Sequence, residues 1–359
     1  MFTAALIVPT GIGAAIGGYA GDSMAIARAM GQVCDSVITH PNVLNGAQLY
    51  WSEPNIYYVE GYGLDRFTRG EWGLEPVRQN KIGLLLDRAI EPELKLRHLQ
   101  AADATRATMG LDIADYVVTD APLDIGLQTA TSGASWGTIG NPGSLLRGAE
   151  KLITQAGVDA IAIVARFPDD EDSQALQDYR HGSGVDHLAG AEAIISHLVV
   201  RQFQVPAAHA PALAPIPVDP DVAPRAAAEE LGYTFLPCVL VGLARAPRFV
   251  VRDRVNQSVT NYKAPSNPRN IVWGNEIDAL IIPETACGGS SVLSLSQSSA
   301  KIITVKNNAT QMSVSPEMLG IKHLAVNSYL EALGVLVALR GGISLAPFDP
   351  HLPSLNLLS

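Results

Sequence analysis

Two short apolar runs, each followed at once by a proline and then by glycines, constrain the fold of this chain more than any other feature. Residues 5–10 read Ala-Leu-Ile-Val-Pro-Thr, and residues 279–285 read Ala-Leu-Ile-Ile-Pro-Glu-Thr. A continuous apolar run bounded in this way is typical of a strand buried on both faces of a parallel sheet. Glycines just beyond such a strand let backbone N–H groups approach a bound molecule. The pattern therefore predicts two ligand-binding loops at strand ends.

Further apolar runs alternate with helical patterns, which favours βα units. We expect strands at residues 5–8, 36–39, 56–59, 82–86, 116–119, 160–164, 279–282 and 302–305. We expect helices at residues 22–33, 92–108, 142–155, 188–203, 224–231 and 326–339. The sequence thus predicts a three-layer α/β fold with mostly parallel, doubly wound sheets.

The recurrence of the strand–proline–glycine pattern suggests two Rossmann-like halves. We place the first at residues 1–155 and the second at residues 156–345, followed by a tail at residues 346–359. Six prolines between residues 206 and 224 predict a stiff, irregular linker. The polar stretch 256–275 predicts a hinge or a surface loop.

The composition excludes some classes of function. The net charge of the 359 residues is −10 and no basic run is present, so nucleic acid is a poor partner. Three widely spaced cysteines without a CxxC pair indicate a reducing compartment. No basic segment precedes the first apolar run, which Pro9 interrupts, and residues 235–246 are too few to span a bilayer. We expect a cytoplasmic homo-oligomer that does not enter the membrane.

The first candidate site is the glycine loop with Thr10, Gly11 and Gly13. No Lys-Ser/Thr pair follows it, and Ile16 stands where a dinucleotide fingerprint has its third glycine. The loop is therefore either a tight turn or a pocket for an anion or small polar molecule, with NAD(P) binding as an alternative.

The second and third candidates also follow predicted strands. His40, Asn42 and Asn45 come after residues 36–39 and offer hydrogen-bond donors and acceptors to a crevice. Arg166 comes after residues 160–164 and is suited to holding a carboxylate or phosphate. A structural histidine in a turn and a surface arginine paired to an aspartate are the alternatives.

A fourth candidate is a set of histidines, of which His209 lies among small residues in a context that looks buried. His181 and His187 are expected in the core or at helix caps, whereas folding could bring His197 and His209 together. The chain has no HExxH motif or close histidine pair, so no metal site is assigned, and the cofactor is left open.

The fifth candidate is the loop Thr285–Gly289. Cys287 precedes Gly288 and Gly289 where a helix is expected to begin, a position that stabilises a thiolate and offers backbone donors for an oxyanion. A buried, inert cysteine in a loop that only holds a ligand is the alternative.

Together these loops resemble a protein family of cyanobacteria, plastids and some other bacteria that is catalogued as a domain of unknown function. The matching stretches are spread over nearly the whole chain, at residues 8–14, 39–46, 132–137, 164–169 and 285–289. The chain also resembles, more distantly, two-cysteine racemases, but it has no second cysteine at the position that would match Cys287. The family resemblance implies a soluble protein of cytoplasmic or plastid type and no particular reaction.

We therefore expect an enzyme that acts on a small polar or anionic metabolite by hydrolase, lyase or isomerase chemistry. Its cleft would lie between the Gly11–Gly18 and Thr285–Gly289 loops, with Cys287 as the reactive group and His40 or His209 tuning its protonation. Arg166 and the amides near Gly13 would hold the substrate. A nucleotide-dependent oxidoreductase and a non-catalytic ligand-binding protein are the rival hypotheses.

Overall fold

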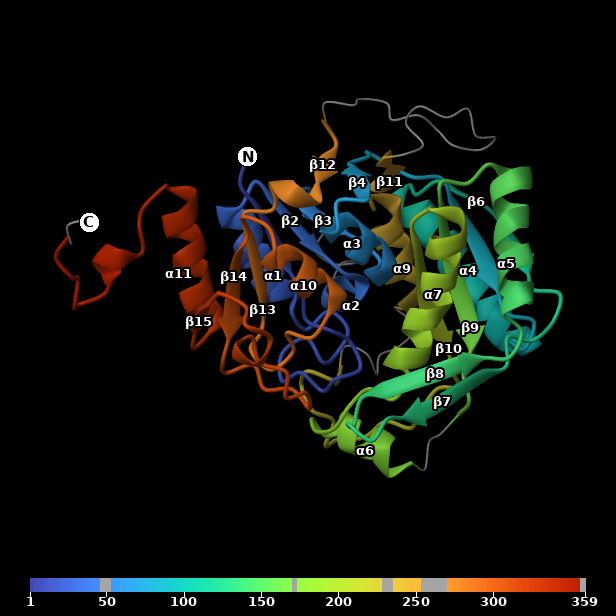
Figure 1. Ribbon diagram of the computed structural model, residues 1–359. Helices are drawn as coiled ribbons and strands as arrows, with labels where there is room; N and C mark the ends of the chain where they lie inside the picture. Colours follow the sequence, from blue (N-terminus) through green and yellow to red (C-terminus); the bar gives the residue numbers. More distant parts are fainter. Residues whose placement is uncertain (46–52, 170–172, 228–234, 253–269, 356–359) are drawn as a thin grey trace.

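Two parallel sheets form the framework of the computed structural model, which describes residues 1–45, 53–169, 173–227, 235–252 and 270–355 (Figure 1). The first sheet has six strands in the order β15-β14-β13-β1-β2-β3. Their bounds are Thr3–Leu6 (β1), Ser36–Thr39 (β2), Ile56–Tyr58 (β3), Ala279–Pro283 (β13), Lys301–Val305 (β14) and His323–Val326 (β15). This is the 3-2-1-4-5-6 order of the Rossmann fold, and the direction of winding reverses between β1 and β13.

The second sheet has four parallel strands in the order β10-β9-β5-β6. Their bounds are Ile82–Leu86 (β5), Ile113–Val118 (β6), Ala160–Arg166 (β9) and Ala207–Ala212 (β10). Two small antiparallel groups complete the strands that the structure describes. They are Trp72–Glu75 (β4) with Arg248–Val251 (β11) and Val272–Trp273 (β12), and the pair Ile125–Thr129 (β7) and Ser135–Ile139 (β8).

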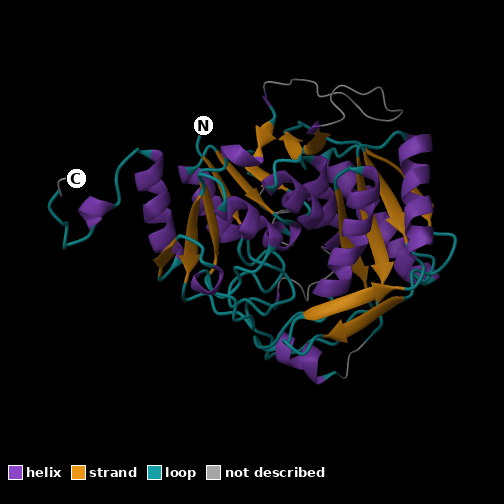
Figure 2. Cartoon of the chain, in the orientation of Figure 1, coloured by secondary structure: helices purple, strands orange, loops and turns teal. Residues whose placement is uncertain are grey.

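Helices cover both faces of the two sheets, and each helical layer has its own hydrophobic core. One core contains residues of α1 (Met24–Val33), α4 (Pro92–Met109), α9 (Phe235–Ala244) and α11 (Tyr329–Arg340). The other contains residues of α3 (Gly61–Thr68), α5 (Pro142–Lys151, continued by a π turn over Leu152–Ala156), α7 (Ala189–Phe203) and α10 (Ser290–Ser296). Strand residues from both sheets contribute to each core, so the expected three-layer α/β fold is confirmed (Figure 2).

The alternation of side chains along β9 shows how the layers form. Ala160 and Ala162 point to the core that contains α9, whereas Ile161 and Ile163 point to the core that contains α7. Successive side chains of a strand point to opposite faces, so both faces of this strand are buried. Such a strand lacks polar alternation, which is the pattern that the sequence predicted for the parallel sheets.

The topology corrects the expected division into halves. The two similar strands β1 and β13 are hydrogen-bonded neighbours in one sheet, with Ala4 opposite Ala279. The first sheet therefore combines both ends of the chain, and β9 pairs with β5 across the boundary expected at residue 155. The similar sequences reflect two central strands with the same surroundings.

The proline-rich stretch is also different from its prediction. Residues 207–212 form β10, an edge strand that pairs with β9. Ala208, Ala210 and Ala212 are buried there, and Pro211 is tolerated because an edge strand has one side that needs no N–H donor. Most of the stretch 256–275 and residues 228–231 of an expected helix lie outside the described residues.

The remaining expected strands and helices are present within a few residues. The structure adds the short helices α2 (Pro41–Leu44) and α6 (Gln174–Arg180), and α3, α9 and α10 also lie outside the expected helical ranges. In the described part of the chain, no helix is both long and apolar enough to cross a membrane. The segment after α11 extends away from the body, and its side chains Phe348, Leu352 and Leu355 are exposed (Figure 1).

Candidate functional site

A cavity of about 840 Å³ lies where the first sheet reverses its winding. On one side it is lined by residues that follow β1, β2 and β13, among them Thr10, His40 and Gly289. On the other side it is lined by the helix α7 and by β10, an edge strand of the second sheet. In open α/β sheets the loops on either side of a reversal diverge and leave a crevice at the carboxyl ends of the strands. The cavity is this crevice, closed by the second sheet.

Histidines and carboxylates are concentrated in the cavity wall. Five of the eight histidines of the chain line it, namely His40, His98, His187, His197 and His209. They share the wall with the acidic residues Glu60, Asp65, Asp169, Asp186 and Glu192. Histidine is the side chain whose protonation is most easily set by burial and neighbouring charge, so this wall is suited to proton transfer.

His197 on α7 forms an ion pair with Glu60, which precedes α3. The Nδ1 atom of His197 contacts Oε1 of Glu60, while Oε2 of the same carboxylate accepts hydrogen bonds from the backbone N–H groups of Tyr62 (2.8 Å) and Gly63 (3.1 Å). Glu60 therefore caps α3 and orients the imidazole at once. Gly61 makes room for this contact, because a Cβ there would lie 2.9 Å from Cε1 of His197.

Burial and the neighbouring carboxylates have opposite effects on the pKa of His197. Burial lowers the pKa, but the hydrogen bond and charge of Glu60 and the charge of Asp65 outweigh burial and leave the pKa raised. The environment thus favours the protonated imidazolium at His197. This is the arrangement of a histidine that is ready to donate a proton.

His209 on β10 has the opposite environment. Its Nδ1 lies 3.0 Å from Oγ of Ser196, and its Nε2 lies 3.7 Å from Oε2 of Glu192. Burial, followed by the charge of His197, lowers the pKa of His209 to about 3. His209 is therefore neutral at physiological pH. The pKa values of two imidazoles in one cavity are thus shifted in opposite directions. Such separation is typical of paired acid and base groups.

The predicted residues after β2 line the cavity, but their polar groups are largely engaged within the chain. Nε2 of His40 accepts the backbone N–H of Val8 at 3.2 Å, and burial lowers the pKa of His40 to about 4. The side chain of Asn42 donates to the carbonyl of Gly17, and that of Asn45 accepts from the hydroxyl of Tyr58. These residues shape the wall and join the loops.

The glycine loop after β1 contributes Thr10 to the cavity, whereas Gly11 and Gly13 are not part of the wall. Both glycines have positive φ, and a Cβ on Gly11 would lie 2.5 Å from Oγ of Ser135. A Cβ on Gly13 would lie 2.8 Å from the carbonyl of Gly184. These glycines therefore allow close packing of the chain against itself, and the expectation that they hold a ligand is not supported by their surroundings.

Cys287 does not lie in the cavity wall, and its position does not support the expected nucleophile. The side chain is fully buried, and its Sγ is 3.4 Å from the carbonyl oxygen of Glu284. Burial, with the charges of Glu284 and Glu317, raises the pKa of the thiol to about 11. A nucleophilic cysteine needs a lowered pKa and access to substrate. Of the same loop, Gly289 lines the cavity, while Thr285 and Gly288 do not.

Arg166 likewise lies outside the cavity. Its guanidinium is paired with Asp169 and with Glu91, and it borders a separate shallow depression. Its hydrogen bonds to Asp169, partly offset by burial, and those to Glu91 raise the pKa of Arg166. Because both carboxylates already neutralise the guanidinium, its surroundings do not support the expected role of holding a substrate anion.

The sequence analysis did not assign Glu60, Glu192, Ser196 and His197 to the site. Glu192 and Ser196 are four residues apart on α7 and therefore share one face of the helix, which is a signal that the sequence contains. The contact between Glu60 and His197 joins residues that are far apart in the chain. Only the packing of α3 against α7 brings these two side chains together.

Comparison with known proteins places the chain in a family. Residues 3–348 match the family model described as protein of unknown function (DUF3326). The chain belongs to this family. It is also 54% identical over 357 residues to an uncharacterized lipoprotein of Synechococcus sp., an alignment that covers 99% of this chain and 96% of the relative. No solved structure matches the chain.

Proposed function

We propose that the chain is an enzyme that transfers protons to and from a small polar metabolite bound in the cavity. The observation that carries this proposal is the opposite protonation of His197 and His209 in one cavity wall. His197 is the general acid, oriented by Glu60, and His209 is the general base. Proton removal by one imidazole and donation by another is the chemistry of isomerases and lyases.

The mechanism follows from the hydrogen-bond partners of the two imidazoles. His209 contacts Ser196 through Nδ1, so its other nitrogen, beside Glu192, takes the proton. The carboxylate of Glu192 lies 3.7 Å from that nitrogen and stabilises the imidazolium that forms. His197 gives its proton to the developing negative charge, and the carboxylate of Glu60 holds the ring in place.

The experiment that tests this function is incubation of the purified chain with a metabolite extract in D₂O, followed by mass spectrometry. The proposal predicts that a small polar compound gains deuterium or is converted, and that His209→Gln abolishes the change. His181→Gln is the matched control, because His181 pairs with Asp219 outside the cavity wall. A compound that binds without deuterium gain or conversion would instead support a ligand-binding protein.

A second candidate is an oxidoreductase that binds NAD(P), and the strand order of the first sheet favours it. The carboxylate of Asp22 weighs against it, because it accepts the N–H of Gly17 beside the start of α1, where a dinucleotide phosphate would lie. Calorimetric titration with NADH and NADPH distinguishes the two candidates: binding supports the oxidoreductase, and no heat supports the proton-transfer enzyme.

We also infer that the protein works in the cytoplasm. Its three cysteines, Cys34, Cys238 and Cys287, are free and buried, which is typical of a reducing compartment. The Synechococcus relative carries the name of a lipoprotein. Fractionation of the native cells, with detection by antibody, tests the inference: recovery with the membranes would contradict it.

A further inference from the structure

The loop after β13, of which Ala286 and Gly289 line the cavity, is tied to residues 310–314. The N–H of Cys287 donates to the carbonyl of Val314, and the N–H of Val314 donates to the carbonyl of Thr285, both at 2.9 Å. The hydroxyls of Thr285 and Thr310 lie 2.8 Å apart. These bonds hold the loop against the segment that leads into the short helix at Glu317–Leu319.

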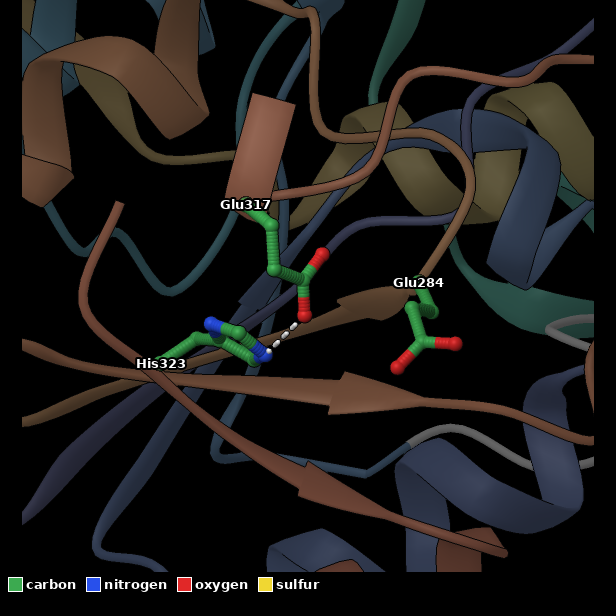
Figure 3. Close-up of side chains that lie close together, drawn as sticks. All are labelled: Glu284, Glu317 and His323. Atoms are coloured by element: carbon green, nitrogen blue, oxygen red, sulfur yellow. Dashed lines mark ion pairs between the residues drawn. The ribbon is translucent and has the colours of Figure 1, made fainter. Parts of the chain in front are cut away.

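Close to these hydrogen bonds, three side chains of metal-ligating types lie together. Glu284 immediately follows β13, Glu317 begins the short helix, and His323 begins β15. One ligand atom from each lies within 4.8 Å of the others, and Nε2 of His323 is 3.1 Å from Oε1 of Glu317. Figure 3 shows the two carboxylates and the imidazole facing one another. None of the three lines the central cavity.

The second imidazole nitrogen of His323 is also engaged. Nδ1 of His323 lies 3.1 Å from the carbonyl oxygen of Ile321 and can only donate to it. With Nδ1 engaged in this way, Nε2 is the ring nitrogen that faces Glu317 and is placed to bind a metal ion. Metal-ligating histidines have this second bond to a backbone carbonyl, which orients the ring and fixes its tautomer.

We propose that Glu284, Glu317 and His323 bind a divalent transition-metal ion, for which Zn²⁺ is the natural probe. One imidazole nitrogen and two carboxylate oxygens form a donor set that suits Zn²⁺, whereas Mg²⁺ prefers oxygen ligands alone. The side chain of Glu317 is 62% exposed, so the ion has a path from solvent and water completes its coordination. The buried Cys287 loop then serves to place Glu284 at this site.

The test is calorimetric titration of the full chain, freed of metal with EDTA and dialysed, first with ZnCl₂ and then with MgCl₂. The proposal predicts one Zn²⁺ per chain at this site and weaker Mg²⁺ binding. His323→Gln removes this Zn²⁺, and Glu284→Gln or the exposed Glu317→Gln weakens it at least about tenfold. Zn²⁺ also raises the thermal unfolding temperature of the wild type more than that of the variants.

His181→Gln is the matched control, since it removes an imidazole that also pairs with a carboxylate elsewhere on the surface. Thermal unfolding in EDTA shows that each variant is folded. The proposal is overturned if the wild type binds no Zn²⁺ or if His323→Gln and Glu284→Gln bind it as the wild type does. It is equally overturned if His209→Gln alone removes the Zn²⁺, because the ion would then belong to the cavity.

Discussion

The central cavity and the Glu284–Glu317–His323 cluster both include residues that follow β13, and both combine histidine with carboxylates. In the cavity, His197 and His209 each have their own carboxylate partner, and His209 is buried enough that its pKa falls to about 3. In the cluster, two carboxylates converge on one imidazole, and one of them is largely exposed.

The difference shows how the number of carboxylate partners directs histidine chemistry. An imidazole beside a single carboxylate, with its protonation set by that charge or by burial, serves proton transfer. An accessible imidazole facing two carboxylates presents convergent lone pairs, which serve cation binding. The comparison predicts that variants in the two regions affect different measurements, and four experiments test it on the cavity side and on the loop.

The largest expected effect is on turnover in His209→Gln. Glutamine keeps a polar group near Ser196 but cannot take a proton, so turnover of the metabolite consumed by the wild type should fall about 10²–10⁴-fold. Zn²⁺ binding to the cluster should not change. Turnover within a few-fold of the wild type would show that His209 is not the base.

A smaller effect is expected in Glu60→Gln. The amide oxygen can still cap α3, but the charge that raises the pKa of His197 is lost. Burial, which lowers the pKa of His197, is then opposed only by the charge of Asp65. The pKa should therefore fall below 6.5. NMR titration of the imidazole measures this, and turnover should drop about 10²-fold with it. An unchanged pKa would show that Glu60 does not raise the pKa of His197.

The pH dependence of stability tests the burial of His209 directly. Its pKa is about 3 in the folded chain, against 6.5 for an unperturbed imidazole, so between these values the unfolded chain binds more protons. The free energy of unfolding therefore falls as the pH is lowered through this window, by on the order of 2 kcal/mol between about pH 7.5 and pH 5 from this residue. Urea unfolding at both pH values measures it.

His209→Gln is the control in that experiment, because the loss specific to His209 should be absent from the variant. The comparison with the variant is needed because Asp22 acts in the opposite sense. Burial raises the pKa of Asp22 to about 6, so its protonation favours the folded state at low pH. Equal pH dependence in the wild type and in the variant would show that His209 titrates normally.

The smallest effect is expected from Cys287→Ser. The thiol is buried and lies outside the cavity wall, so turnover should remain at the wild-type level. The free energy of unfolding should fall by about 1 kcal/mol, because a more polar group replaces a buried thiol. Kinetics and urea unfolding measure the two quantities, and a large loss of turnover without loss of stability would restore Cys287 as a catalytic residue.

The elements of the fold could be predicted because their signals are local. Buried runs such as residues 82–86 and 160–164 contain uninterrupted apolar residues, and a helix such as α5 begins at an Asn-Pro pair. The order of the strands was not predictable in this way. The pairing of β1 with β13 joins the two ends of the chain, and β10 forms despite its proline because it lies at a sheet edge.

The candidate site was predictable mainly where it followed strand ends. Thr10, His40 and Gly289 line the cavity as expected from their positions after buried strands, and His209 does so from an unexpected strand. The partner of His197 was not predictable, because Glu60 is distant in sequence and its contact depends on helix packing. The surroundings of Cys287 show that a loop motif does not reveal the burial of its thiol.

The measurement that tests the central claim most directly is an NMR pH titration of the imidazole nitrogens of the folded wild type, assigned with His197→Gln and His209→Gln. The account predicts that His197 titrates above 6.5, while His209 stays neutral down to the low pH at which its pKa of about 3 applies. If both imidazoles titrate together near 6.5, the cavity does not separate an acid from a base, and the proposed proton transfer is contradicted.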